Sequence, residues 1–157
     1  MVKKYFELKD EVSEKDLLEM TPWALILFSN FVLYCEQRGL PVKITSIKND
    51  GANIKRVSKS HSQGRALDIS VVGWTETQIK KAVSYFNNRF KHIGAISFSD
   101  GQSRAIVYHD SGYGAHFHLQ VRPMDEKIFI DKKKGLLAKT LEKFPHILKE
   151  KIKCKCF

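Results

Sequence analysis

Residues 58–70 read SKSHSQGRALDIS and place a histidine, a glycine and an aspartate within one short stretch. In its second half, Leu67 and Ile69 alternate with Asp68 and Ser70. Alternate residues of a β-strand face opposite sides, so this pattern predicts a strand whose apolar side chains enter the core while Asp68 faces away from them. A carboxylate within a buried strand is costly unless it is paired or binds a metal. The stretch therefore predicts either a polar loop that leads into a buried strand or half of a metal site.

A second stretch, HFHLQV, begins at His116 and has the same alternation. As a strand it presents one apolar face and one polar face, and the polar face carries His116, His118 and Gln120. The two imidazoles are then about 7 Å apart, because a strand rises roughly 3.3 Å per residue. If this strand lies beside the strand of Asp68, the two polar faces coincide, and His61 reaches the same place from the preceding loop.

Two histidines and one carboxylate, with one position open to water, are the ligand set of a catalytic zinc site. Such a site lowers the pKa of water to about 7, and a third imidazole nearby can act as general base. Gly64 is expected to have a positive φ angle, which turns the chain so that His61 can meet Asp68. A polar loop that leads into a buried strand, without a metal, stays an alternative, because a single histidine is more often a surface or core residue than a ligand.

The remaining patterns predict an α+β domain in which N-terminal helices pack on a central antiparallel sheet of about four or five strands. Ser13 and Thr75 are suited to cap helices, each with a partner three residues later, and Pro22 is suited to begin a third helix that stops at Gly39. Strands are expected at 42–47, 66–72, 95–99, 105–110 and 116–121. We expect a domain over 1–125 and a basic, amphipathic helical extension over 126–157 that packs on the same domain.

The composition limits the function classes. The chain has 27 Lys and Arg against 17 Asp and Glu, a formal charge of +10. Much of the excess lies in 126–157, which favours an anionic partner such as a cell-wall polymer, a membrane surface or nucleic acid. The most apolar run, residues 23–35, is interrupted and shorter than the roughly 20 residues that span a bilayer, so it predicts a buried helix. No signal peptide is visible, which predicts synthesis in the cytoplasm. An odd number of cysteines argues against a disulfide framework, and Cys35 is expected to be buried.

The spacing of four residues is more specific than the composition. His61, Gly64, Ala66 and Asp68 fit the pattern H-x-x-G-x-A-x-D, and Ser60 stands directly before His61. Together with the later H-x-H, this resembles the D-Ala-D-Ala metallopeptidase family of D,D-carboxypeptidases, D,D-dipeptidases and phage endolysins that cut peptidoglycan peptides. The family belongs to a wider zinc group that includes lysostaphin-type peptidases and the hedgehog domain. The resemblance covers roughly residues 44–121.

The resemblance implies a hedgehog/D,D-peptidase-like fold and a zinc ion (Zn2+) held by His61, Asp68 and His118. Many members carry a catalytic glutamate three residues before the last histidine ligand, and Ala115 stands there in this chain. The H-x-H form instead resembles members whose first histidine activates water, which makes His116 the expected base.

Other polar and aromatic residues have two interpretations each. Arg65 could bind a substrate carboxylate or stabilise an oxyanion, and Arg56 and Lys48 are weaker candidates for a similar role. His109 and Asp110 could orient His116 or simply form a strand end that enters a turn. Trp74 and Tyr113 could line the site or pack in the core or on the surface.

These inferences predict a zinc metallopeptidase that hydrolyses peptidoglycan stem peptides or cross-links. It would be made in the cytoplasm and act at the cell wall after release, or belong to a phage or prophage virion. Segment 126–157 would bind an anionic wall polymer. The first alternative is a zinc-bearing binding or structural domain without catalysis. The second is a nucleic-acid-binding protein, which the charge suggests but no recognisable motif supports.

Overall fold

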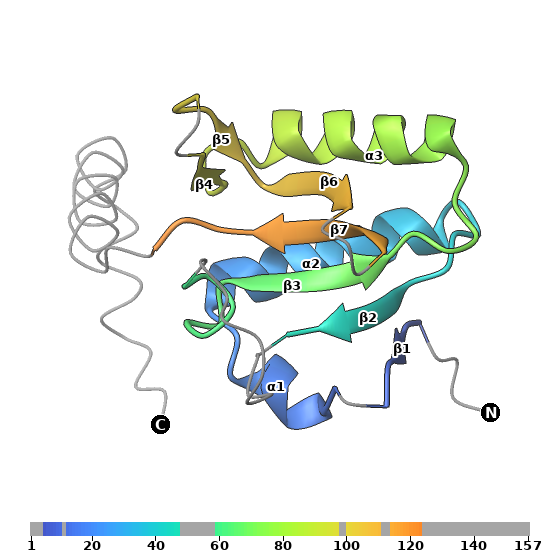
Figure 1. The fold of residues 1–157 in the computed structure, drawn as a ribbon, viewed down its shortest axis with the longest axis horizontal. Coiled ribbons are helices and arrows are strands. Elements are labelled where there is room, and N and C mark those ends of the chain that lie inside the picture. Colours follow the sequence, from blue (N-terminus) through green and yellow to red (C-terminus); the bar gives the residue numbers. More distant parts are fainter. Residues whose placement is uncertain (1–4, 11, 48–58, 98–99, 111–113, 124–157) are drawn as a thin grey trace, which may run out of the picture. The chain divides into compact units, whose positions relative to one another are not determined.

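The structure is a computed structural model that describes residues 5–10, 12–47, 59–97, 100–110 and 114–123. It confirms an α+β arrangement (Figure 1). Some predictions lie outside the described residues, namely those for Lys48, Arg56, Tyr113 and the helical extension at 126–157.

Three helices begin where the sequence predicts. Helix α1 (Glu14–Leu18) starts with a capping box in which Ser13 and Asp16 each accept a hydrogen bond from the other's backbone N–H. Helix α2 (Pro22–Glu36) begins at its proline, and Gly39 follows with a φ angle of 62°. Helix α3 (Glu76–Arg89) begins with a second capping box between Thr75 and Gln78. Caps satisfy backbone donors that the first helical turn leaves unpaired, which explains why these positions start helices.

The central sheet has five strands in the order β1-β2-β3-β7-β6. Their bounds are Glu7–Leu8 for β1, Lys43–Ser46 for β2, Ala66–Ser70 for β3, Ile106–Asp110 for β6 and Ala115–Gln120 for β7. Strands β2, β3, β7 and β6 pair antiparallel with their neighbours. Strand β3, which the sequence predicts from its alternation, therefore lies next to β7, which carries the H-x-H pair.

The prediction of a wholly antiparallel sheet is wrong at one edge, because β1 pairs with β2 in parallel. Backbone N–H groups of Glu7 and Lys9 donate to the carbonyls of Val42 and Ile44 at 2.9 Å. The chain between β1 and β2 contains α1 and α2, and a helical connection of this length returns a strand in the same direction. Two residues are too few for alternation to be visible in the sequence.

The run at 95–99 also differs from expectation. Its strand part is β4 (Ala95–Ile96), which pairs with β5 (Ser103–Arg104) in a separate two-stranded sheet rather than in the central one. Gly94 lies against the backbone at Arg104 so closely that a Cβ atom there would be 2.6 Å from the Arg104 carbonyl carbon. The segment that enters β4 therefore lies directly against the backbone that joins β5 to β6.

The core lies between the central sheet and the helices, and α2 lies behind β3 and β7 in Figure 1. Phe31 of α2 contacts Phe117 of β7 and Phe86 of α3, with ring centroids 5.6 and 5.3 Å apart. Trp74 packs on Phe31 and Phe117, and its Nε1–H donates to the carbonyl of Pro41 at 3.0 Å. Trp74 is therefore a core residue. Apolar side chains of β3 and β7 point to this core, so their polar residues lie on the opposite face, which we call the ligand face.

Candidate metal centre

The pairing of β3 with β7 builds the centre of the ligand face. Their antiparallel register places Asp68 directly opposite His118 and Ser70 opposite His116. Side chains of directly opposed residues project to the same side of a sheet, so the polar faces of the two predicted strands coincide. The two strands are therefore neighbours, as their matching polar faces require.

His61 reaches the same place from a tight turn before β3. A hydrogen bond from the N–H of Gly64 to the carbonyl of His61 (2.9 Å) closes the turn, and one from the N–H of Thr21 to the carbonyl of Gly64 (2.8 Å) ties the turn to the segment before α2. Gly64 has a φ angle of 63°, and a Cβ atom there would lie 2.5 Å from the carbonyl oxygen of Glu19. Glycine is therefore required twice, by its backbone conformation and by the close approach of the segment that joins α1 to α2.

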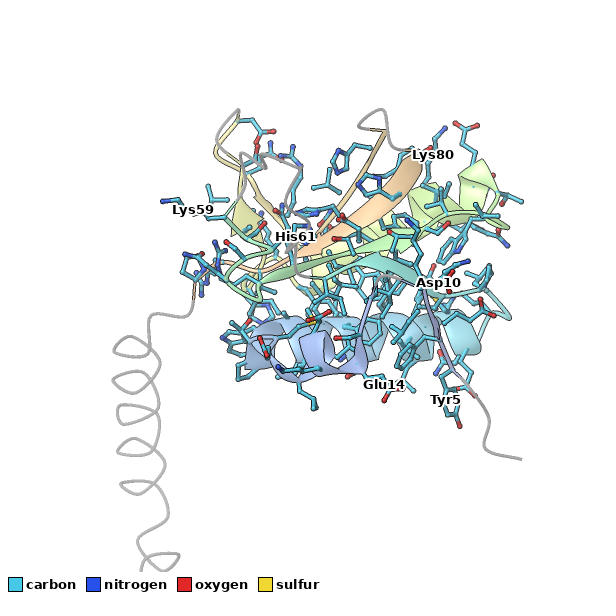
Figure 2. The ribbon with its side chains drawn as sticks, turned by 60° about the horizontal axis from the view of Figure 1, so that its bottom comes forward. Tyr5, Asp10, Glu14, Lys59, His61 and Lys80 are labelled. Carbon is cyan, nitrogen blue, oxygen red and sulfur yellow. The ribbon has the colours of Figure 1, made fainter. Side chains whose placement is uncertain are left out.

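Three possible ligand atoms converge, namely His61 Nε2, Asp68 Oδ1 and His118 Nδ1, all within 4.8 Å of one another. His118 Nδ1 lies 2.8 Å from Asp68 Oδ1, and His61 Nε2 lies 3.3 Å from each of the other two atoms. Atoms bound at 2.0–2.1 Å to a tetrahedral zinc lie roughly 3.3 Å from one another. The donor set and its spacing therefore fit a divalent metal ion such as zinc with little rearrangement. Figure 2 shows His61 above the sheet, on the side away from the helix α2.

The hydrogen bonds of His61 determine which of its nitrogens can bind a metal. Its Nδ1 lies 2.6 Å from the carbonyl oxygen of Ile47, which can only accept, so Nδ1 carries the proton. The unprotonated Nε2 then points to Asp68 and His118. A second hydrogen bond that orients a ligating imidazole in this way is typical of metal sites. His61 is only 1% exposed, so its ring has little freedom to turn.

The charge of Asp68 is held in place by the same histidines. Burial raises the pKa of this carboxyl, but the hydrogen bond from His118 and, when its ring is protonated, the hydrogen bond and charge of His61 outweigh burial and hold the pKa well below its usual range. A buried carboxylate that stays ionised is a hard anionic ligand at any ordinary pH. The structure therefore explains how this strand tolerates an aspartate.

His116 lies next to the three candidate ligands without joining them. Its Nε2 is 3.9 Å from Asp68 Oδ1, and its Nδ1–H donates to the carbonyl of Gly114 at 2.8 Å. In the neutral form of the ring, Nε2 is then the unprotonated nitrogen, and it faces the centre. His109 of β6 lies beside it, with ring centroids 4.5 Å apart, and its ring is 5.9 Å from that of His118.

Arg65 is not part of this cluster. Its Nη1–H donates to the carbonyl of Val121 at 2.7 Å, and its Nε–H and Nη2–H donate to Gln63 Oε1 at 2.9 and 2.7 Å. Burial lowers the pKa of Arg65 from its ordinary value, although a guanidinium remains protonated in proteins. These contacts engage three of the five N–H groups of the side chain. The guanidinium is thereby tied to the end of β7, and its role in binding substrate stays a prediction.

Two groups that orient the histidines were missed by the sequence analysis. They are the main-chain carbonyls of Ile47 and Gly114, which accept hydrogen bonds from His61 and His116. Every residue type offers a backbone carbonyl, so no signal in the sequence could have identified them.

Comparison of the chain with models of protein families, with curated proteins and with solved structures found no significant match in any of the three. Among the residues that the structure describes, no helix combines the length and apolarity needed to cross a bilayer.

Proposed function

We propose that the chain is a zinc-dependent peptidase that hydrolyses stem peptides or cross-links of peptidoglycan. The observation that carries the proposal is the convergence of three donor atoms within 4.8 Å, with His116 Nε2 3.9 Å from the carboxylate oxygen among them. A metal site with an adjacent imidazole that can accept a proton is suited to hydrolysis. The substrate class follows from the resemblance of the H-x-x-G-x-A-x-D and H-x-H patterns to the D-Ala-D-Ala metallopeptidases.

Zinc held by His61, Asp68 and His118 would supply a Lewis acid for the scissile carbonyl and would lower the pKa of the attacking water to about 7.

His116 is the residue that moves the proton. Its Nδ1–H is engaged by the carbonyl of Gly114, so Nε2 can accept a proton from water on the ligand face. The imidazolium then holds this proton at Nε2 until the leaving amine takes it. The ring of His109 packs beside that of His116 and restricts its rotation. Ala115 stands where many of the resembled enzymes carry a glutamate, so the proposed mechanism depends on His116 alone for general-base catalysis.

Arg65 binds a carboxylate of the substrate in this proposal, through N–H groups that Gln63 and Val121 leave unengaged. The enzyme acts at the cell wall after release from the cytoplasm, or as part of a phage virion. The basic segment 126–157 attaches it to an anionic wall polymer.

The test is digestion of purified peptidoglycan by the zinc-loaded chain, with fragments identified by mass spectrometry. We expect the wild type to release peptide fragments and His116→Ala to release them at least about a hundredfold more slowly, the usual contribution of a positioned base. His92→Ala is the matched control, because His92 is exposed and contacts Trp23 rather than the ligand face. Zinc content should be unchanged in both variants.

Each result decides between functions. Zinc binding without release of any fragment by the wild type would favour a binding or structural domain and reject the peptidase. Full activity of His116→Ala would reject the assigned base. Absence of bound zinc in the wild type would reject the metal centre itself.

A further inference from the structure

Gln120 is the third polar residue of β7 on the ligand face, after His116 and His118. Alternation in the strand places its Cα about 7 Å beyond that of His118 on the same side of the sheet. The register pairs Gln120 with Ala66, two residues before Asp68 on β3. Gln120 therefore borders the candidate metal centre on the side away from His116.

The side-chain amide of Gln120 has no hydrogen-bond partner among the described residues. Its backbone N–H donates to the carbonyl of Ala105 at 2.8 Å, but the amide itself forms no such contact, although the residue is half-buried. Among the described residues, Thr21 Oγ1 is the side-chain polar atom that is both fully buried and without a partner. The Gln120 amide also has no partner, so its polar atoms are not fully buried and remain accessible to solvent. A primary amide has two N–H donors and one carbonyl acceptor, all of which a ligand could use.

The neighbours of Gln120 on either side have small side chains. Ala66 of β3 lies on one side and Ala105, directly before β6, on the other; each has a single methyl group, and both are fully buried. By contrast, the next row along the strands carries Asp68 and His118. In the row of Gln120 the two alanines are covered, so the unengaged amide is the polar group of that row.

We propose that Gln120 is a specificity-determining residue whose amide binds a backbone peptide group of an extended substrate; this rests on the proposed peptidase function. A peptide group offers one donor and one acceptor, which a primary amide matches with its own acceptor and donor. An extended chain advances roughly 3.3 Å per residue, so the 7 Å from His118 to Gln120 corresponds to about two residues. The substrate must therefore continue about two residues past the bond held at the metal centre, on the Gln120 side.

The test compares substrates of different length. Mass spectrometry first locates the bond that is cut in a peptidoglycan stem pentapeptide or a cross-linked dimer. Synthetic peptides then end either one or three residues past that bond, on each side in turn. On one side of the bond, the peptide that extends three residues should contact Gln120. For this peptide we expect Gln120→Ala to raise KM by roughly three- to tenfold and to change kcat by less than about twofold, as for loss of ordinary hydrogen bonds. The shorter peptide on that side should show no difference between wild type and variant.

Two controls separate this role from a structural one. Gln37→Ala removes an exposed amide at the end of α2, far along the sequence from the ligand face, and should leave KM unchanged for all peptides. Gln120→Glu keeps the acceptor but not the donors and should recover only part of the affinity. An equal rise in KM for long and short peptides, or no rise at all, overturns the proposal.

Failure of the peptidase proposal gives a different result. If the wild type cuts no peptide, binding of the intact pentapeptide to the zinc-loaded chain is measured by calorimetry. Binding that Gln120→Ala weakens by roughly three- to tenfold supports the role of Gln120 without catalysis. Absence of binding by the wild type, or equal binding by the variant, rejects it.

Discussion

Asp68 and His118 are direct cross-strand partners inside the central sheet, and Oδ1 of Asp68 lies 2.8 Å from Nδ1 of His118. Burial alone would disfavour the ionised form of this carboxyl. The histidines of the site surround it. An ionised side chain in this position is stable because its partners are fixed by the register of two strands.

Asp68→Asn should abolish stoichiometric zinc binding, because the amide keeps the shape of the side chain but removes its charge. Zinc retained after gel filtration and the rise in Tm on zinc addition are the measurements. At a hundred times its Kd, a ligand stabilises the folded state by about 2.7 kcal/mol, so the rise should be visible in the wild type and absent in the variant. Asp100→Asn, which removes an exposed partner of Arg104, is the control. Undiminished zinc in Asp68→Asn would exclude the aspartate from the site.

Gly64→Ala should destabilise the protein far more than Gly39→Ala. Both glycines have φ angles near 60°, so alanine costs about 1–2 kcal/mol at either position. Nothing lies within 4 Å of a Cβ atom at Gly39, whereas one at Gly64 would meet the carbonyl oxygen of Glu19 at 2.5 Å. The free energy of unfolding from urea titration should therefore fall further for Gly64→Ala, and zinc affinity should fall only in that variant. Equal losses in the two variants would show that the close approach is unimportant.

Asn87 of α3 acts as a partner for the outer edge of β6. Its Oδ1 accepts from the N–H groups of Ala105 and Ile106 at 2.8 and 3.0 Å, and its Nδ2–H donates to the carbonyl of Ile106 at 2.9 Å. We expect Asn87→Ala to lower the free energy of unfolding by about 2–3 kcal/mol, because part-buried backbone groups lose their partners. Asn88→Ala removes only an exposed contact with Ser84 and should change the free energy of unfolding by less than about 0.5 kcal/mol. Similar values for both would contradict the role assigned to Asn87.

Cys35 should make the folded state less stable at high pH. Burial raises the pKa of its thiol from 9.0 to about 12, and the charge of Arg38 opposes this only in part. Since the raised pKa belongs to the folded state, the contribution is fully present below pH 9 and is lost as the pH rises toward 12. Between pH 8 and 10.5 the wild type should lose on the order of 1–2 kcal/mol more than Cys35→Ala, measured by urea unfolding. Cys154 and Cys156 are present in both proteins and cancel. Parallel pH curves would refute the prediction.

The candidate ligands could be predicted from the sequence because each belongs to a strong local pattern. Apolar alternation identified the faces of β3 and β7, and this placed Asp68 and His118 on the polar side before their pairing was known. Capping residues likewise marked the starts of α1 and α3. Alternation and capping depend only on residues close together in the sequence, so they can be recognised without knowledge of the fold.

Other features depend on contacts between distant segments and could not be predicted. Strand β1 has only two residues, and its parallel pairing with β2 is determined by the helices between them. The orientation of His61 depends on a backbone carbonyl fourteen residues away in sequence, which has no signature. The hydrogen bond of Arg65 to the Val121 carbonyl likewise joins residues 56 positions apart, and it holds the guanidinium beside the end of β7.

The three candidate ligands are far apart along the chain, since His118 follows Asp68 by 50 residues and His61 by 57. The centre therefore does not exist until β3 and β7 have met, and closing such long intervals is the slow part of folding for a sheet. A metal ion could join only after that step, and would leave before the strands separate. Its presence should accordingly lengthen the lifetime of the folded chain while leaving the rate of folding almost unchanged.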